Sequence, residues 1–129
     1  MIEERLKKLN IILPPAPAPA ANYAPYVITN KLIFISGQIP LIDGEMIQGK
    51  VGEDTEVETA VKAARACALA IIAQLKEATN SRLDSISRIV KLGGFVNCVD
   101  TFTQQPEIIN GASDLMIEVF GDKGKHSRF

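Results

Sequence analysis

KLIFISGQIP, residues 31–40, joins an unbroken apolar run to small and polar residues. The run Leu32–Ile35 contains β-branched and aromatic members, which is typical of a strand covered on both faces. Ser36-Gly37-Gln38 follows where this strand would end, and Pro40 cannot donate the next ladder hydrogen bond. The glycine lets a ligand or another chain approach the main chain closely, although an ordinary exit from a strand into a loop has the same residues. The stretch predicts a buried strand with a candidate site at its C-terminal end.

Two further strands are expected close to this one. Residues 26–29 predict a short strand that forms a hairpin with residues 32–35 across Asn30-Lys31. Asp43-Gly44 is a strong turn signal, and residues 45–50 predict a third strand that is weakened by Gln48 and two glycines.

Helical periodicity is clearest between Asp54 and Leu75. Asp54 or Thr55 can cap a helix, acidic residues follow in its first turn, and apolar residues keep helical spacing up to Leu75. A turn of helix is expected within residues 83–89 and a strand over residues 90–99. Gly93-Gly94 inside that strand indicates a bulge or a close backbone contact.

A second amphipathic helix begins near Pro106 and is stopped by Gly121. The order β-β-β-α-β-α predicts an α+β domain whose helices pack on one face of a mixed β-sheet. No strand is predicted after Gly121, so nothing would pair back onto the sheet from that end.

The first 25 residues differ in composition from the rest. A short helix is expected from Ile2 to about Asn10, because Ile2, Leu6 and Leu9 share one face. Prolines alternating with alanines over residues 11–25 exclude a helix or an interior strand. This arm is expected to be a semi-rigid spacer on the domain surface; a ligand for aromatic grooves is the alternative. The 129 residues fit a single domain, with residues 1–25 as helix and arm and residues 26–129 as core.

Composition excludes several classes of function. The 14 basic and 15 acidic residues nearly balance, so no broad field would gather nucleic acid or an anionic membrane. Cys67 and Cys98 have neither metal-ligand nor redox spacing and are expected to be reduced and buried. The N-terminus lacks an apolar signal core and no run reaches membrane-spanning length, which predicts a cytoplasmic location.

No metal cluster, P-loop, dinucleotide motif or nucleophile elbow is present. Three single residues are candidates for the site, and each of them also has a purely structural interpretation. His126, the only histidine, is a candidate general base, but its polar surroundings favour a solvated surface side chain. Arg128 could clamp a carboxylate, whereas its position in the sequence favours a frayed end. Tyr26 could offer a hydroxyl to a ligand or only pack in a half-buried strand.

Taken together, Pro25-Tyr26, LIFISGQIPL, Asp43-Gly44-Glu45, the alanine-rich helix, VKLGGFVNCVDTF and a late arginine resemble the RidA/YjgF family. This family of enamine/imine deaminases is also called endoribonuclease L-PSP-like. The branch with an N-terminal helix and a proline-rich arm is the most similar. The resemblance covers essentially the whole chain and implies a chorismate-mutase-like fold, assembled as a homotrimer with small-molecule clefts between subunits.

The resemblance also implies an activity and a set of residues. Family members are hydrolases that convert reactive 2-enamine and 2-imine acids to 2-keto acids and ammonia, without a cofactor. By this resemblance Arg128 holds the substrate carboxylate, since His126-Ser127-Arg128 stands where the family has Pro-Ala-Arg, and Tyr26 lines the cleft. The residues expected to bind substrate are Ser36, Gly37, Val96, Asn97, Cys98 and either Asn110 or Ser113, which align ambiguously with a family asparagine.

Two departures leave an alternative function open. His126 replaces the family proline, and the family continues past the arginine into strands carrying a glutamate that orients water, so this chain is expected to be truncated. The alternative is a non-catalytic trimeric protein that binds or senses 2-keto acids. Nucleic-acid cleavage is disfavoured, because no stripe of basic and aromatic residues is present. The expected partners are a small carboxylate and other copies of the chain, with no nucleic acid, membrane or metal.

Overall fold

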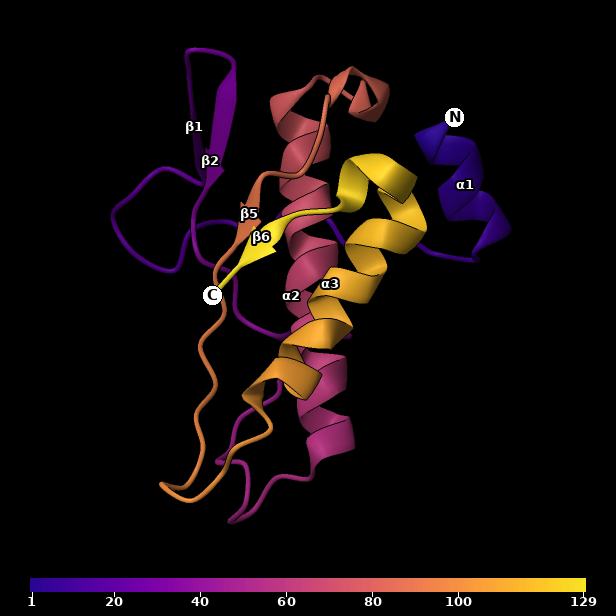
Figure 1. The fold of residues 1–129 in the computed structure, drawn as a ribbon. Coiled ribbons are helices and arrows are strands. Elements are labelled where there is room, and N and C mark those ends of the chain that lie inside the picture. The colour runs from indigo at the N-terminus through magenta and orange to yellow at the C-terminus, as the bar shows by residue number, and fades with distance from the viewer. The chain divides into compact units, whose positions relative to one another are not determined.

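Helix α2, Val57–Ala78, is the longest element of the computed structural model, which describes all residues 1–129 (Figure 1). The chain divides into two compact units, and α2 contributes to both. Residues 1–38 and 69–87 form the first unit, and residues 39–68 and 88–129 form the second.

The predicted central helix is confirmed, but its predicted cap is wrong. The Asp54 carboxylate closes the preceding turn, accepting hydrogen bonds from the Lys50 backbone N–H at 2.6 Å and the Thr55 hydroxyl at 3.0 Å. Ala68 and Ile72 are fully buried on α2, as the apolar spacing predicted. Asn80 and Ser81 take φ values of 52° and 65° and end the helix.

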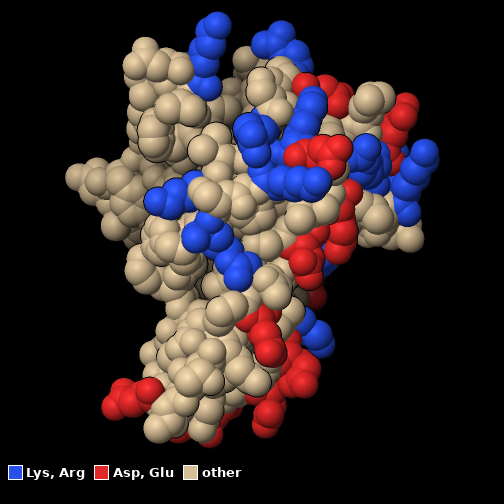
Figure 2. All heavy atoms as spheres, in the orientation of Figure 1, with Lys and Arg blue, Asp and Glu red and all other residues tan.

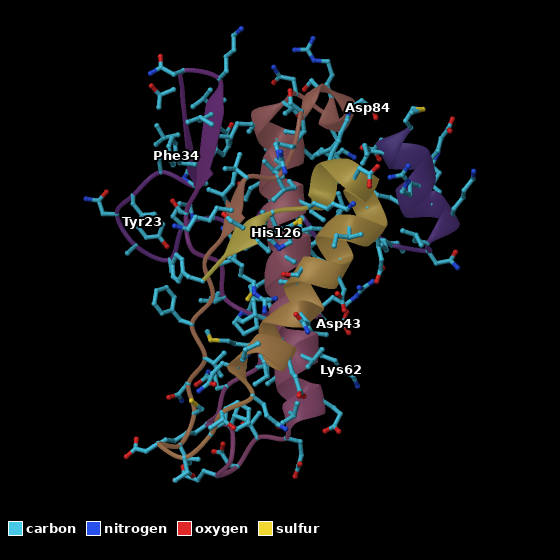
Figure 3. All side chains as sticks on the ribbon, in the orientation of Figure 1. Tyr23, Phe34, Asp43, Lys62, Asp84 and His126 are labelled. Atoms are coloured by element: carbon cyan, nitrogen blue, oxygen red, sulfur yellow. The ribbon has the colours of Figure 1, made fainter.

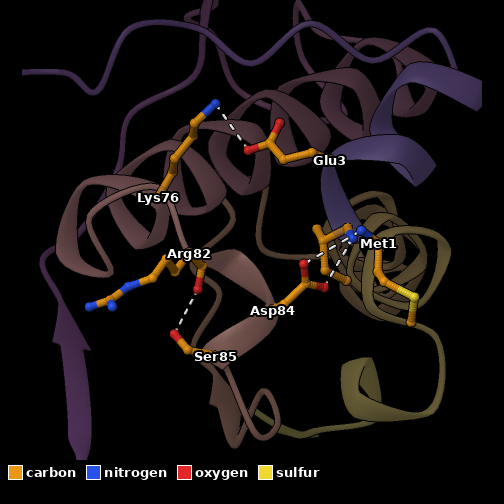
Figure 4. A network of polar contacts seen from close by, with 7 residues as sticks. Met1, Glu3, Lys76, Arg82, Asp84 and Ser85 are labelled. Carbon is orange, nitrogen blue, oxygen red and sulfur yellow. Dashed lines mark hydrogen bonds and ion pairs between the residues drawn. The ribbon is translucent and has the colours of Figure 1, made fainter.

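The first unit contains helix α1, Ile2–Lys8, and the 3₁₀ turn η1, Leu83–Ser85. Ile2 and Leu6 are buried on one face of α1, in agreement with the sequence pattern. The Asp84 carboxylate accepts a hydrogen bond from the Ile2 N–H at 3.1 Å and pairs with the Met1 amino group at 3.5 Å (Figure 4). These contacts tie the start of α1 to η1.

The proline-alanine arm contains no helix or strand between residues 11 and 25. Gln74, a residue of α2 with only 2% of its surface exposed, donates a hydrogen bond from Nε2 to the Pro17 carbonyl at 2.7 Å. This buried amide holds the arm against the helix within the first unit, which agrees with a spacer that lies on the protein surface.

Strands β1, Tyr26–Thr29, and β2, Leu32–Ile35, form the predicted antiparallel hairpin, with Tyr26 opposite Ile35. The prediction that residues 32–35 are covered on both faces is wrong for this chain. Leu32 is 45% and Phe34 56% exposed, whereas Ile33 and Ile35 are partly buried, so one face of β2 is left uncovered.

The second unit has two short ladders in place of longer strands. Strands β3, Leu41–Ile42, and β4, Glu45–Met46, pair across the Asp43-Gly44 turn, so the predicted strand over residues 45–50 is reduced to two residues. The predicted strand over residues 90–99 is likewise reduced to β5, Lys91–Leu92, and an isolated bridge between Cys98 and Val51.

Gly93 and Gly94 are points at which other residues approach this strand closely. A Cβ atom on Gly93 would lie 2.6 Å from the Phe129 ring, and one on Gly94 would lie 2.6 Å from Ile109 Cδ1. Both glycines are therefore sites of close approach, as their position inside the strand indicated.

After Gly121 the chain continues as the 3₁₀ turn η2, Gly121–Gly124, and strand β6, Ser127–Arg128, which pairs in parallel with β5 (Figure 1). The prediction that no strand follows Gly121 is therefore wrong. A two-residue strand has no alternating pattern to detect, and its pairing partner is distant in the sequence.

Helix α3, Gln105–Phe120, has Pro106 in its first turn and ends at Gly121, as predicted. Its apolar face supplies the core of the second unit, where Leu115, Met116 and Val119 are fully buried. A Cβ atom on Gly111 would collide with the Val61 carbonyl oxygen, so this glycine lets α3 lie directly against the backbone of α2. The α+β class is confirmed, with the sheet present as three two-stranded ladders. No helix is long and apolar enough to cross a membrane.

Candidate functional site

Arg128 lies on a strand whose backbone is fixed on both sides. The Ser127 N–H donates to the Val90 carbonyl at 3.0 Å, and the Phe129 N–H donates to the Leu92 carbonyl at 3.2 Å. These ladder bonds show that Arg128 is not a frayed end, although its local sequence favoured one.

The guanidinium group of Arg128 is bound by three residues of α3. Nη1 donates to Asn110 Oδ1 at 2.8 Å and to Ser113 Oγ at 3.0 Å, and Nη2 donates to the Pro106 carbonyl at 3.2 Å. An arginine has five N–H donors, so the N–H on Nε and one on Nη2 remain for another acceptor. Adjacent nitrogens of this kind match the two oxygens of a carboxylate.

A pocket of about 300 Å³ lies beside this guanidinium in the second unit. Arg128 is its only charged lining residue, and most of the other walls are apolar or glycine: Gly94, Val96, Gln105, Pro106, Ile109 and Phe129. The arrangement suits a small molecule that carries one carboxylate and an otherwise apolar body.

His126 continues the polar contacts away from the pocket, between β6 and α3 (Figure 3). Its Nε2 lies 2.8 Å from Ser113 Oγ and its Nδ1 lies 2.6 Å from the Gly124 carbonyl oxygen. The expectation of a solvated surface histidine is wrong, because both ring nitrogens have protein partners and the side chain is half-buried.

Nearly the whole sequence also matches a known protein family. Residues 3–129 match the family described as "YjgF/chorismate_mutase-like, putative endoribonuclease". The chain belongs to the YjgF/chorismate-mutase-like family. Protein TCP17 of Trypanosoma cruzi is 43% identical over 129 residues, which cover 98% of this chain and 80% of that protein.

Two solved structures are similar to this protein over nearly the full chain. Protein Atu1372 of Agrobacterium tumefaciens, described as having unknown function, has a TM-score of 0.89 and 43% identity, covering 99% of this chain and 78% of its own. A protein of Shewanella oneidensis described as a "putative endoribonuclease" has a TM-score of 0.95 and 38% identity, covering 100% and 85% of the two chains. The family and fold predicted from the sequence are confirmed.

Of the predicted binding residues, Val96, Asn110 and Ser113 gather around Arg128 in the family fold. Val96 lines the pocket, whereas Asn110 and Ser113 contact the guanidinium. Sequence alignment left a choice between Asn110 and Ser113, but both hold Arg128. They lie on one face of α3 because residues three and four apart are neighbours on a helix.

Asn97 and Cys98, which were predicted to bind substrate, are not among the residues that line the pocket. Asn97 Nδ2 donates to the Gly49 carbonyl at 2.8 Å, which fixes the loop before α2. Cys98 Sγ lies 3.6 Å from Gln105 Nε2, and Gln105 itself lines the pocket. The Cys98 side chain therefore contacts a residue that lines the pocket, whereas the Asn97 side chain bonds to the loop before α2.

Tyr26, Ser36 and Gly37 belong to the first unit, so their position relative to Arg128 stays a prediction. Ser36 bonds back to the chain before β1, from its N–H to the Pro25 carbonyl at 3.0 Å and from Oγ to the Ala24 carbonyl at 2.6 Å. These two bonds fix the end of β2, while a Cβ atom on Gly37 would meet nothing within 4 Å.

Five lining residues escaped sequence analysis: Gly94, Gln105, Pro106, Ile109 and Phe129. Residues 106, 110 and 113 share one helical face, and this spacing could have placed Pro106 beside Asn110 and Ser113. No group of three or more His, Cys, Asp or Glu residues could hold a metal ion. Cys67 and Cys98 form no disulfide, and burial raises the pKa of the Cys67 thiol to about 11.

Proposed function

We propose that this protein hydrolyses small 2-enamine and 2-imine acids to 2-keto acids and ammonia. One observation carries the proposal: Arg128 lines a small, largely apolar pocket with two of its N–H donors still available. The activity of the resembled deaminase family supports it, because every substrate of that class carries a carboxylate.

In this proposal Arg128 binds the carboxylate through Nε and Nη2 and so fixes the adjoining C=N carbon. The enamine first takes a proton at its terminal carbon and becomes an imine. Water then adds to the imine carbon, and loss of ammonia leaves the 2-keto acid. Positioning of this kind lowers the entropic barrier without a strong side-chain base.

The proposal includes assembly as a homotrimer with the substrate in clefts between copies. The hairpin β1–β2 exposes Val27, Ile28, Leu32 and Phe34, whose side chains are 45% to 56% accessible. Contiguous apolar strands are typical of surfaces that another chain covers. Tyr26, Ser36 and Gly37 would contribute to such a cleft from this hairpin.

A coupled assay tests the proposed activity. A serine dehydratase releases 2-aminoacrylate continuously, and 2-keto acid formation is followed after the purified protein is added. We expect acceleration by the wild-type chain and its loss in Arg128→Ala. The control, Arg82→Ala, removes an exposed arginine whose side chain bonds only the Thr79 carbonyl, and this variant should remain active.

The alternative of a non-catalytic binder has one observation in its favour. None of the residues lining the pocket is an aspartate or a glutamate, the side chains that commonly orient an attacking water. Saturable binding of a 2-keto acid with no turnover in the coupled assay would support this alternative and contradict the deaminase proposal.

The Shewanella protein is described as a "putative endoribonuclease". Ribonuclease activity is less well supported for this chain than the deaminase proposal. The face drawn in Figure 2 consists largely of uncharged residues, and the chain carries a net charge of −1. Binding to RNA depends strongly on neutralising phosphates with lysine and arginine. Cleavage of RNA by wild type but not by Arg128→Ala would reverse this preference.

A further inference from the structure

The contacts around Arg128 form a chain of hydrogen bonds with one consistent direction. The Gly124 carbonyl can only accept, so it requires the proton on His126 Nδ1. The guanidinium can only donate, so Ser113 Oγ accepts from Nη1. In the neutral ring, His126 Nε2 is then free to accept the Ser113 hydroxyl proton across the 2.8 Å that separates them.

The far end of this chain is rigid. Gly124 lies so close to α3 that a Cβ atom there would collide with the Met116 carbonyl oxygen. Ser113 is buried, with 8% of its surface exposed, and is held within α3. The Ser113 hydroxyl therefore cannot move away from His126 without breaking a buried hydrogen bond.

The near end controls which edge of the guanidinium faces the pocket. The bonds to Asn110 and Ser113 use both hydrogens of Arg128 Nη1, and the Pro106 carbonyl accepts one hydrogen of Nη2, so the planar group is held at three points on α3. With these bonds in place, Nε and Nη2 keep the remaining donors. Without the Ser113 bond, Nη1 would have a spare donor, and only the bonds to Asn110 and Pro106 would fix the orientation of the guanidinium.

We propose that Ser113 and His126 are positioning residues that hold Arg128 in the orientation that binds a carboxylate. His126 acts through Ser113, and Ser113 acts through Arg128, since neither Ser113 nor His126 lines the pocket. This inference rests on the carboxylate-binding role of Arg128 proposed above. It assigns a function to the histidine that stands where the resembled family has proline.

The test measures binding of 2-oxobutanoate and of its uncharged amide to the full chain by calorimetry. We expect Ser113→Ala to weaken the acid about tenfold, the effect of losing one hydrogen bond to a charged group. Binding of the amide should fall much less, because the amide offers Arg128 one neutral acceptor oxygen in place of a two-oxygen carboxylate. A general loss of structure would instead weaken the binding of both ligands.

Two conservative replacements of His126 separate positioning from simple packing. In His126→Gln the amide oxygen can reach the place of Nε2 and accept from Ser113, so acid binding should be retained. In His126→Asn the shorter amide can replace only the bond to Gly124, so acid binding should fall as in Ser113→Ala. The Arg128 Nε–H signal in an NMR spectrum, assigned with Arg128→Lys, should shift or broaden in Ser113→Ala and His126→Asn alone.

Each outcome bears on the inference. Equal acid affinity in wild type, Ser113→Ala and His126→Asn would overturn it, as would equal losses in His126→Gln and His126→Asn. Acid binding that depends on Ser113 without any turnover would contradict the deaminase proposal and leave this inference standing. Turnover that needs Arg128 but is unchanged in Ser113→Ala would overturn this inference and leave the deaminase proposal standing. An Arg128 signal unaffected in every variant would also overturn it, even if a variant bound ligand poorly for lack of stability.

Discussion

Replacement of Gly111 by alanine should destabilise the protein even though alanine is the better helix former. Gly111 lies inside α3, where intrinsic propensity alone would favour alanine by about 1 kcal/mol. The added Cβ would collide with the Val61 carbonyl oxygen of α2 and lie 3.0 Å from Val61 Cγ1. The two effects have opposite signs, so the direction of the change decides which one dominates.

The magnitude follows from the kind of atom that is struck. Overpacking costs about 1–3 kcal/mol, and a backbone oxygen in a helix cannot turn aside as a side chain can, which favours the upper value. After the gain in propensity, we expect a net loss of about 2 kcal/mol. For a chain of this length that corresponds to a fall in Tm of roughly 8 °C.

Thermal unfolding by circular dichroism at one fixed protein concentration measures this change. Gly37→Ala is the matched control, since its Cβ would meet nothing within 4 Å, and it should leave Tm unchanged or slightly raised. Adding Val61→Ala to Gly111→Ala should not restore Tm, because the struck oxygen belongs to the backbone. A Tm for Gly111→Ala equal to or above that of wild type would refute the close contact between the helices.

Three further predictions concern the arm and the two groups with shifted pKa values. Gln74→Ala should cost about 1–2 kcal/mol and speed proteolysis of the arm, because the buried bond to the Pro17 carbonyl is lost; Gln104→Ala, an exposed glutamine, should show neither effect in limited digestion. Burial raises the pKa of Cys67 from 9.0 to about 11, so the thiol ionises at lower pH in the unfolded chain than in the folded one. The free energy of unfolding should therefore fall between pH 9 and 11. Urea titrations of Cys67→Ala should not show this fall. The hydrogen bond from the Lys50 N–H is the main cause that lowers the pKa of Asp54 below 3.8. The ionised carboxylate therefore stabilises the fold above pH 3.8, and this stabilisation is lost as pH falls through the lowered pKa of the folded state. The difference in free energy of unfolding between wild type and Asp54→Asn should vanish in strong acid.

Long periodic elements could be predicted from the sequence because their signals are local. The apolar spacing that ends at Leu75 and the Pro106 and Gly121 boundaries give α2 and α3 nearly as observed. The hairpin over residues 26–35 was also predictable, since both strands and their turn are adjacent in the chain. Burial of that hairpin was not, because a run of apolar residues does not reveal what covers it.

The candidate site depends on contacts that no local pattern contains. Local sequence left Arg128 open between a carboxylate clamp and a frayed end, and only family resemblance favoured the clamp, because the ladder that fixes Arg128 pairs residues 91 and 127. His126 was misjudged for the same reason, since its partners Ser113 and Gly124 are brought to it by α3 and η2. Residues next to one another in sequence predicted a solvent-exposed tail, whereas tertiary contacts make it part of the site.

The parallel pairing of β5 with β6 has a consequence for folding kinetics. Parallel neighbours need a crossover, and here it consists of the loop after β5, helix α3 and η2, so the ladder closes only after that whole segment is in place. Closing such a distant contact costs chain entropy before it contributes stability, and it is therefore expected late in folding. The pocket beside Arg128 then exists only in molecules that have completed the crossover. A ligand held by Arg128 would bind only the native state. The free energy of unfolding would therefore rise with the concentration of that ligand.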